Sequence, residues 1–200
     1  MTCYWQNKYI VKKMKDKEEK KIEKDNGTVY RIGIIGTGRI AARFLAEARE
    51  VKAAEVTIVY NPKRESAQKF EQQWNVQSTD DLMLFFLMSD IVYVASPHET
   101  HYGYIQKALQ KDKHVISEKP MVLKKAEAEK LCRLAEERNL ILLEGIKTLY
   151  CPGYQMVLKL VAGGTIGTLC NVEACFTKLE KRHTRELNDT LYGGSFTELG

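Results

Sequence analysis

Hydrophobic and polar positions along this chain alternate between short apolar runs and longer segments with helical spacing. The run at 90–95 is nearly continuous in its apolar character, which is typical of a strand buried on both faces. The strands expected from such runs are 30–35, 55–60, 90–95, 114–117 and 140–144. The expected helices are 40–49, 64–74, a short one ending at 86 after the N-cap at 79–81, 102–110 and 124–138. Strands that alternate with helices predict βαβ units, hence a doubly wound, parallel-sheet Rossmann domain of the α/β class.

The pattern changes after Glu144. Pro152 is suited to start a helix over 153–160, which would end at the glycine pair 163–164, and a strand-like segment follows at 169–178. We interpret these elements as the start of an α+β substrate or dimerisation domain. The expected division is a charged leader at 1–29, helical or flexible, a dinucleotide-binding domain at 30–150, and an incomplete second domain at 151–200.

Composition and charge exclude several classes of protein. The net charge is +5, but residues 1–29 hold eight lysines and five acidic residues, interleaved as on a solvated surface. We therefore expect no nucleic-acid groove. No apolar run approaches the roughly 20 residues that cross a bilayer, so we expect no membrane span. Five cysteines without a Cys-x-x-Cys pair favour free thiols in the cytoplasm, and we expect no metal site.

A glycine-rich turn follows the first expected strand, in the order Gly36, Thr37, Gly38, Arg39, Ile40, Ala41. Gly36 permits a tight turn, and Gly38 presents no side chain to a phosphate. Ala41 allows the next helix to pack closely, with its N-terminus towards an anion. These residues are expected to bind a dinucleotide pyrophosphate, although such turns also occur for packing alone.

The end of the second expected strand bears on the choice of cofactor. NAD is usually held there by an acidic residue, but this chain has Asn61, Lys63 and Arg64. Asn61 can bond a ribose hydroxyl, and the two cations can pair with a 2′-phosphate. This favours NADP over NAD. The alternative is that both cations only begin a surface helix.

A second polar site follows the strand 114–117, where Ser117 precedes Glu118, Lys119 and Pro120. Ligands of open α/β sheets lie beyond the carboxyl ends of the strands. Lys119, partly desolvated, could hold a substrate hydroxyl and move its proton as hydride leaves carbon. Pro120 would fix the loop, and a cis bond is one way to do so. The alternative is an ordinary surface tripeptide.

Together these motifs resemble the glucose-fructose oxidoreductase, inositol dehydrogenase and MocA (Gfo/Idh/MocA) family. The resemblance covers about 30–200 and rests on the glycine turn and the segments 95–102, 113–120, 143–145, 166–167 and 193–200. It implies that NAD(P) binds the first domain. It also implies oxidation or reduction of a carbon of a sugar, cyclitol or diol held by a second domain, whose open sheet often forms a dimer.

The resemblance also assigns site residues. The family lysine corresponds to Lys119, beside Glu118, and its cofactor loop to Ser96 and Pro97, with His98 where asparagine is usual. Glu198 takes the place of a catalytic aspartate. His101 is expected at the mouth of the cofactor cleft or as a helix cap.

An arginine common in the family is missing, since position 150 is tyrosine. Among the members of this family, the chain is most similar to the dihydrodiol-dehydrogenase-like ones, in which a tyrosine often replaces a histidine of the site. The resemblance implies an NAD(P)-dependent oxidoreductase, which would form a homo-oligomer if its second domain were complete. The alternative is a non-catalytic nucleotide-binding or sensing module that keeps the cleft.

Overall fold

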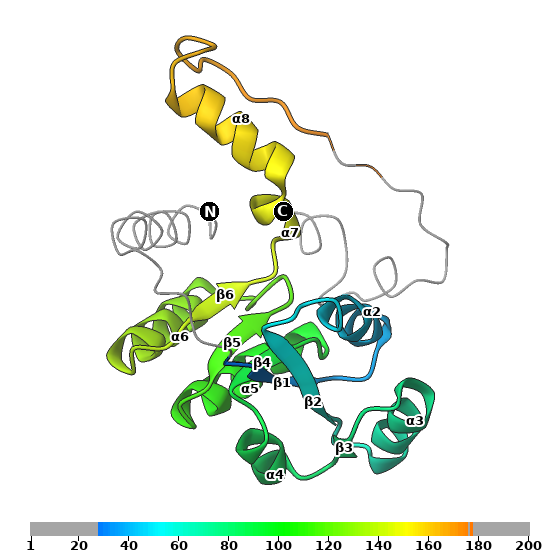
Figure 1. Cartoon of the computed structure of the whole chain (residues 1–200). Coiled ribbons are helices and arrows are strands. Elements are labelled where there is room, and N and C mark those ends of the chain that lie inside the picture. The colour runs from blue at the N-terminus through cyan, green and yellow to red at the C-terminus, as the bar shows by residue number, and fades with distance from the viewer. Residues whose placement is uncertain (1–27, 176, 178–200) are drawn as a thin grey trace. The chain divides into compact units, whose positions relative to one another are not determined.

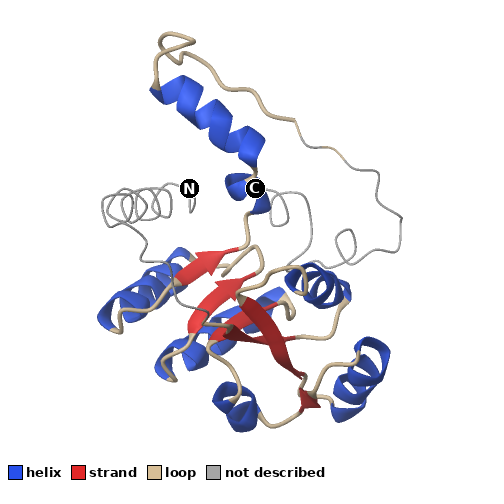
Figure 2. Cartoon of the chain, in the orientation of Figure 1, coloured by secondary structure: helices blue, strands red, loops and turns tan. Residues whose placement is uncertain are grey.

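The computed structural model describes residues 28–175 and 177. Its centre is one six-stranded parallel sheet of strand order β3-β2-β1-β4-β5-β6, with helices flanking it (Figures 1 and 2). This is the doubly wound order, and it confirms the predicted Rossmann fold. By their contacts the residues fall into two compact units, which divide inside β4 (Ile91–Val94), between Ile91 and Val92.

The first unit supplies one half of the sheet. Its elements are β1 (Tyr30–Ile35), α2 (Arg39–Ala48), β2 (Ala54–Tyr60), α3 (Arg64–Trp74), β3 (Ser78–Thr79) and α4 (Leu82–Leu87). Parallel pairing sets Ile35 beside Tyr60 and Val59 beside Ser78. The core is built from side chains that no solvent reaches, among them Ile34, Leu45, Ile58, Val59 and Phe85. Burial of such side chains is the main source of stability here.

The short helix α4 is held by its cap and by aromatic packing. The side chain of Asp81 accepts hydrogen bonds from the N–H groups of Met83 and Leu84, as the sequence predicted. The ring of Phe85 lies 5.8 Å from that of Tyr60 and 5.5 Å from that of Phe86, between centroids. The contact between Phe85 and Tyr60 joins α4 to β2.

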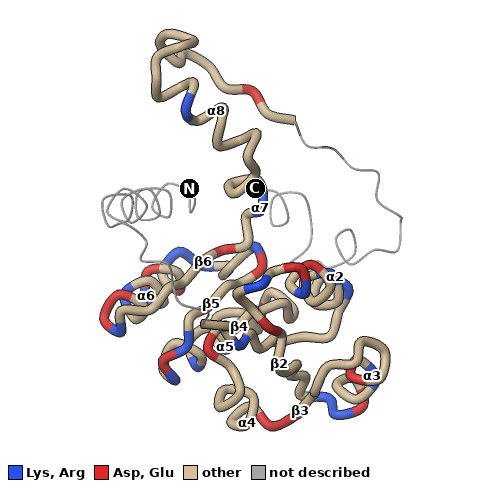
Figure 3. Tube along the Cα trace, viewed as in Figure 1, with Lys and Arg blue, Asp and Glu red and all other residues tan. Residues whose placement is uncertain are grey.

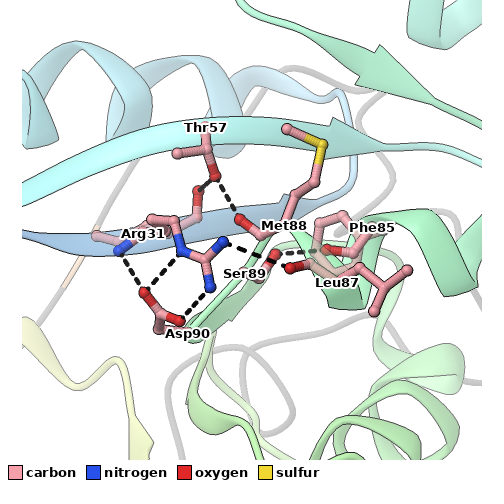
Figure 4. A network of polar contacts seen from close by, with 8 residues as sticks. Arg31, Thr57, Phe85, Leu87, Met88, Ser89 and Asp90 are labelled. Carbon is pink, nitrogen blue, oxygen red and sulfur yellow. Dashed lines mark hydrogen bonds and ion pairs between the residues drawn. The ribbon is translucent and has the colours of Figure 1, made fainter.

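A polar network joins the start of β1 to the residues just before β4 (Figure 4). The Arg31 guanidinium contacts both oxygens of Asp90, at 3.0 Å from Nε and 2.6 Å from Nη2. The hydrogen bond and charge of Asp90 raise the pKa of Arg31. Thr57 donates to the carbonyl of Met88 at 2.8 Å, and Ser89 to that of Phe85 at 2.7 Å. The network fixes the chain between α4 and β4.

The second unit supplies the other half of the sheet. After β4 come α5 (His98–Gln110), β5 (His114–Ser117), α6 (Lys125–Glu137), β6 (Leu142–Glu144), α7 (Lys147–Tyr150) and α8 (Pro152–Ala162). Parallel pairing sets Ser117 beside Glu144 at the carboxyl ends of β5 and β6. Its core includes Val92, Val94, Ile105, Leu109 and Leu131, all with 1% exposure or less.

Several elements differ from the sequence predictions. The strands β1 and β5 and the helix α3 have the bounds that the sequence predicted. The helix α8 ends at Ala162, and its C-cap is Gly163 of the expected glycine pair. The two-residue strand β3 and the single turn α7 were not predicted, because neither is long enough to show a period. The helix α5 begins at His98, four residues early, because its first turn is polar and lies outside the apolar repeat.

The strand expected at 169–178 is wrong for the part of it that is described. Residues 169–175 and 177 belong to no strand, and residues 169–175 are exposed. A strand needs a neighbour to satisfy its backbone N–H and C=O groups, and no strand among residues 28–175 pairs with this segment. Alternating side chains are therefore not enough to form one here.

Candidate functional site

The glycine turn has the backbone geometry of an anion site. Gly36 follows β1 with φ of +112°, a conformation that favours glycine, and its N–H donates to the Tyr60 carbonyl at 2.9 Å. Gly38 is the N-cap of α2, in an extended conformation, and provides no side-chain cap. A Cβ at Gly38 would meet nothing within 4 Å, so packing does not require glycine there.

The first N–H groups of α2, including those of Arg39 and Ile40, have no acceptor from within the helix or from its cap residue. Such groups, together with the helix dipole, favour a phosphate. Ala41 is fully buried, as the close packing of this helix requires. The residues present thus fit a dinucleotide pyrophosphate.

Asn61 connects the glycine turn to the end of β2. Its Nδ2 donates to Thr37 Oγ1 at 2.7 Å, and its Oδ1 accepts from the N–H of Lys63 at 2.9 Å. An amide has a second N–H and a second oxygen lone pair, so Asn61 retains capacity for a ribose hydroxyl. Lys63 and Arg64 begin α3, and both are exposed.

A depression of about 230 Å³ lies beside this turn, lined by Thr37 and by Ser66, Lys69, Phe70 and Gln73 of α3. None of these α3 residues was expected at the site from the sequence. The signal that could have found them is their spacing, since positions 66, 69, 70 and 73 share one helix face. The depression combines a cation, three neutral polar side chains and an aromatic ring.

In the second unit, Glu118 is held by three contacts. Its Oε1 accepts from the Tyr93 hydroxyl at 2.6 Å and lies 3.6 Å from Lys147 Nζ, and its Oε2 accepts from the N–H of Lys119 at 3.4 Å. The Glu118 side chain is only 12% exposed. Its polar partners satisfy a carboxylate that burial would otherwise destabilise. Tyr93 and Lys147 were missed because both lie far from residue 118 in sequence.

The residues that follow Lys119 in the chain are held in place as well. The Lys119–Pro120 peptide bond is cis. The N–H of Met121 donates to Glu144 Oε1 at 2.7 Å. The pKa of Tyr150 is raised by burial and also by the negative charge of Glu144. Lys119 itself is half-buried, as predicted.

His101 does not cap α5, which was one of the two places expected for it from the sequence. His101 is not a cap but the fourth residue of the helix, and its side chain is completely buried. Its ring nitrogens lie 2.9 Å from the Pro120 carbonyl and 2.8 Å from that of Ser96. The His101 side chain is not exposed in this structure, and a contact between His101 and the cofactor stays a prediction.

The ring of His98 meets that of His101 edge-on, at 5.6 Å between centroids. Ser96 Oγ lies 2.7 Å from Thr100 Oγ1, and Pro97 is the exposed N-cap of α5. Glu198 and the leader at 1–27 lie outside the described residues.

Residues 28–175 and 177 contain neither a metal cluster nor a membrane-spanning helix. Within this range no three His, Cys, Asp or Glu side chains are grouped so that they could ligate a metal. None of the described helices has both the length and the apolar character that spanning a bilayer requires.

Comparison with known proteins gives the class. Residues 30–146 match the family described as "Oxidoreductase family, NAD-binding Rossmann fold", the Gfo/Idh/MocA family. This match covers more than half of the chain. The protein belongs to this family.

Individual relatives are sugar and cyclitol enzymes. A dTDP-3,4-didehydro-2,6-dideoxy-alpha-D-glucose 3-reductase of Actinomadura kijaniata is 31% identical, over 76% of this chain and 47% of its own. The scyllo-inositol 2-dehydrogenase (NADP(+)) IolU of Bacillus subtilis is 28% identical, over 86% and 52%. The chain thus spans about half the length of these relatives.

A solved structure agrees with the sequence matches. KijD10, a 3-ketoreductase from Actinomadura kijaniata in complex with NADP and TDP-benzene, superposes with a TM-score of 0.62 at 29% identity. The match covers 68% of this chain and 43% of that one. The matched region shares the fold of a protein that binds NADP.

Proposed function

We propose that this protein is an NAD(P)-dependent oxidoreductase that transfers a hydride between the nicotinamide and an alcohol or carbonyl carbon of a sugar-like substrate. The observation that carries the proposal is the turn after β1. Gly36 has a positive φ, and no protein atom lies within 4 Å of the position of a Cβ at Gly38. The N-terminus of α2 has no side-chain cap. Family membership and the sugar and cyclitol activities of the relatives support it.

NADP is the favoured cofactor. The N–H groups at Gly38, Arg39 and Ile40 would bind the pyrophosphate. Lys63 and Arg64, both exposed at the start of α3, would pair with a 2′-phosphate, and Asn61 would bond the ribose. Ser96, Pro97 and His98 would contact the remainder of the cofactor, as the family resemblance implies.

The chemistry assigned to the chain centres on Lys119. The bound cofactor supplies or accepts the hydride. In the reducing direction, the Lys119 ammonium donates a proton to the carbonyl oxygen as hydride reaches the carbon, and oxidation reverses both transfers. Glu118 would hold the loop and Glu198 would supply a second polar group. The substrate would be a sugar, cyclitol or diol.

We also infer a reducing compartment and assembly into homo-oligomers. The four described cysteines (Cys132, Cys151, Cys170 and Cys175) are free thiols, which supports the cytoplasm. Assembly, most simply as a dimer, is proposed from the family resemblance and from the exposed apolar residues of α8.

The test is a binding titration of the chain with NADPH and NADH, followed by nicotinamide fluorescence. We expect saturable binding that is tighter for NADPH. Gly38→Ala should fold normally, since its Cβ meets no protein atom, but should weaken binding at least about tenfold by obstructing the pyrophosphate.

The matched control is Gly103→Ala in α5, where an added Cβ also meets nothing within 4 Å. It should bind like the wild type. A folded chain that binds neither nucleotide would contradict the proposal. So would equal binding by the two variants, because the glycine turn would then serve only the fold.

A further inference from the structure

The side chain of His101 lies between two loops that both follow strands of the second unit. The Ser96 carbonyl belongs to the segment after β4, and the Pro120 carbonyl to the segment after β5. His101 Nε2 is 2.8 Å from the first oxygen, and Nδ1 is 2.9 Å from the second. No solvent reaches the side chain.

The hydrogen-bond partners of the two ring nitrogens are both carbonyl oxygens, which accept hydrogen bonds and cannot donate them. A neutral imidazole carries one N–H and one lone pair, so it can satisfy only one of the two. The other nitrogen would then face a carbonyl oxygen, lone pair to lone pair, at less than 3 Å. Only the doubly protonated ring donates to both.

We propose that His101 is a positioning residue whose doubly protonated ring clamps the two loops together. The clamp acts directly on the carbonyl of Pro120, the residue after Lys119. Its value for catalysis rests on the proposed function, in which Lys119 Nζ moves the substrate proton. The clamp itself is a property of the folded chain alone.

Other contacts show that this loop is fixed residue by residue. The N–H of Met121 donates to Glu144, and the carboxylate of Glu118 accepts from Tyr93. His101 supplies the anchor between these two points. Burying a cation is costly, and the two charge-assisted hydrogen bonds to carbonyl oxygens offset part of that cost here. The aromatic neighbour identified for the ring is His98, which meets it edge-on.

His114 provides an internal reference with the opposite arrangement. Its Nδ1 accepts a hydrogen bond from the N–H of Ile141 at 3.0 Å. A nitrogen that accepts cannot carry a proton, so His114 should be neutral with its proton on Nε2. The two residues should differ in one spectrum of one sample.

The experiment is a long-range ¹⁵N–¹H correlation spectrum of the whole chain, labelled with ¹⁵N-histidine, at neutral pH. His101→Gln and His114→Gln assign the signals. We expect two protonated ring nitrogens for His101, and one protonated and one unprotonated nitrogen for His114. An unprotonated ring nitrogen at His101 would overturn the proposal.

Hydrogen exchange of the loop measures the positioning. The backbone amides of Lys119 and Met121 should exchange at least about tenfold faster in His101→Leu, which has no donor, and less so in His101→Gln. Lys107→Gln, an exposed change on the same helix, should leave them unchanged. Unchanged exchange in His101→Leu would contradict the clamp.

If His101→Gln does not fold, His98→Gln, His114→Gln and His183→Gln assign the signals of the other three histidines, and the remaining signals belong to His101. None of these measurements involves a nucleotide. A chain that shows a doubly protonated His101 but binds no NADPH would therefore refute the proposed function and leave the clamp standing.

Discussion

Single side chains around Lys119 act mainly by holding its backbone. Glu144 accepts from the N–H of Met121, and Glu118 accepts from the Tyr93 hydroxyl. These acceptors are 23 to 25 residues away from their donors. A half-buried loop needs such partners, because backbone polar groups removed from water must be satisfied elsewhere. The carboxylates around the lysine thus serve to accept hydrogen bonds that hold the loop, in addition to any part in the reaction.

Cys132 allows a prediction at the same scale. Burial on α6 raises the pKa of its thiol, and the charges of Glu136 and Glu144 raise it further. A higher pKa leaves less thiolate, the reactive form, at a given pH. With a disulfide reagent at pH 8, Cys132 should react roughly an order of magnitude more slowly than the exposed Cys151.

The single variants Cys132→Ser and Cys151→Ser identify which phase of the reaction belongs to which thiol. The Cys132 phase should accelerate as the pH rises, since thiolate forms only as the pH approaches its raised pKa. Equal rates for both thiols at pH 8 would show that Cys132 is not buried as described.

At the scale of elements, the close packing of α4 depends on a glycine in β1. A Cβ added to Gly33 would lie 2.1 Å from Ser89 Oγ and 2.6 Å from the ring of Phe85. Phe85 is fully buried and also packs on Tyr60 of β2. Glycine therefore gives α4 the room to approach the sheet.

Gly33→Ala should lower the free energy of unfolding by about 3 kcal/mol, because a packed core cannot absorb the extra atom without moving α4. Urea denaturation followed by circular dichroism measures this. The matched change Gly103→Ala, inside a helix with open space, should keep or raise stability by up to about 1 kcal/mol. Equal stability of the two variants would refute the described packing.

Prediction of elements from the sequence succeeded where the signal is local. Apolar runs bounded by turn residues indicated β1 and β5, and the acid at 81 indicated the start of α4. The strand β3 has only two residues, and it exists because Val59 and Tyr60 of β2 pair with it. Its formation depends on a neighbour and not on its own pattern.

At the scale of the whole molecule, the helix α8 presents an exposed apolar surface. Met156, Val157, Leu158 and Leu160 are each at least 40% exposed, and Tyr154 is 39% exposed. Lys159 is the single charged residue of the helix, and the rest of the α8 tube is tan in Figure 3. Exposed apolar patches of this kind usually take part in association or are covered by a partner.

The chain should therefore bind the dye anilinonaphthalene sulfonate through α8. Met156→Lys combined with Leu160→Lys should reduce the dye fluorescence by about half or more, because both apolar side chains leave the patch. Lys159→Gln, which removes the only charge, should not reduce it. Undiminished fluorescence in the double variant would place the apolar surface elsewhere in the chain.

The sequence by itself determined the alternation of strands and helices and the glycine turn. These depend on neighbouring residues, through backbone conformation and the periodic placement of apolar side chains. It also indicated Lys119 and the loop in which this residue lies.

Only the tertiary structure decided what surrounds these residues. It buried His101 between two carbonyls, set Glu144 against the amide of Met121, and placed Phe85 over Gly33. Each contact joins residues far apart in sequence or requires a particular side-chain volume. Such contacts depend on which elements pack together and on the space between them, and no local pattern records either.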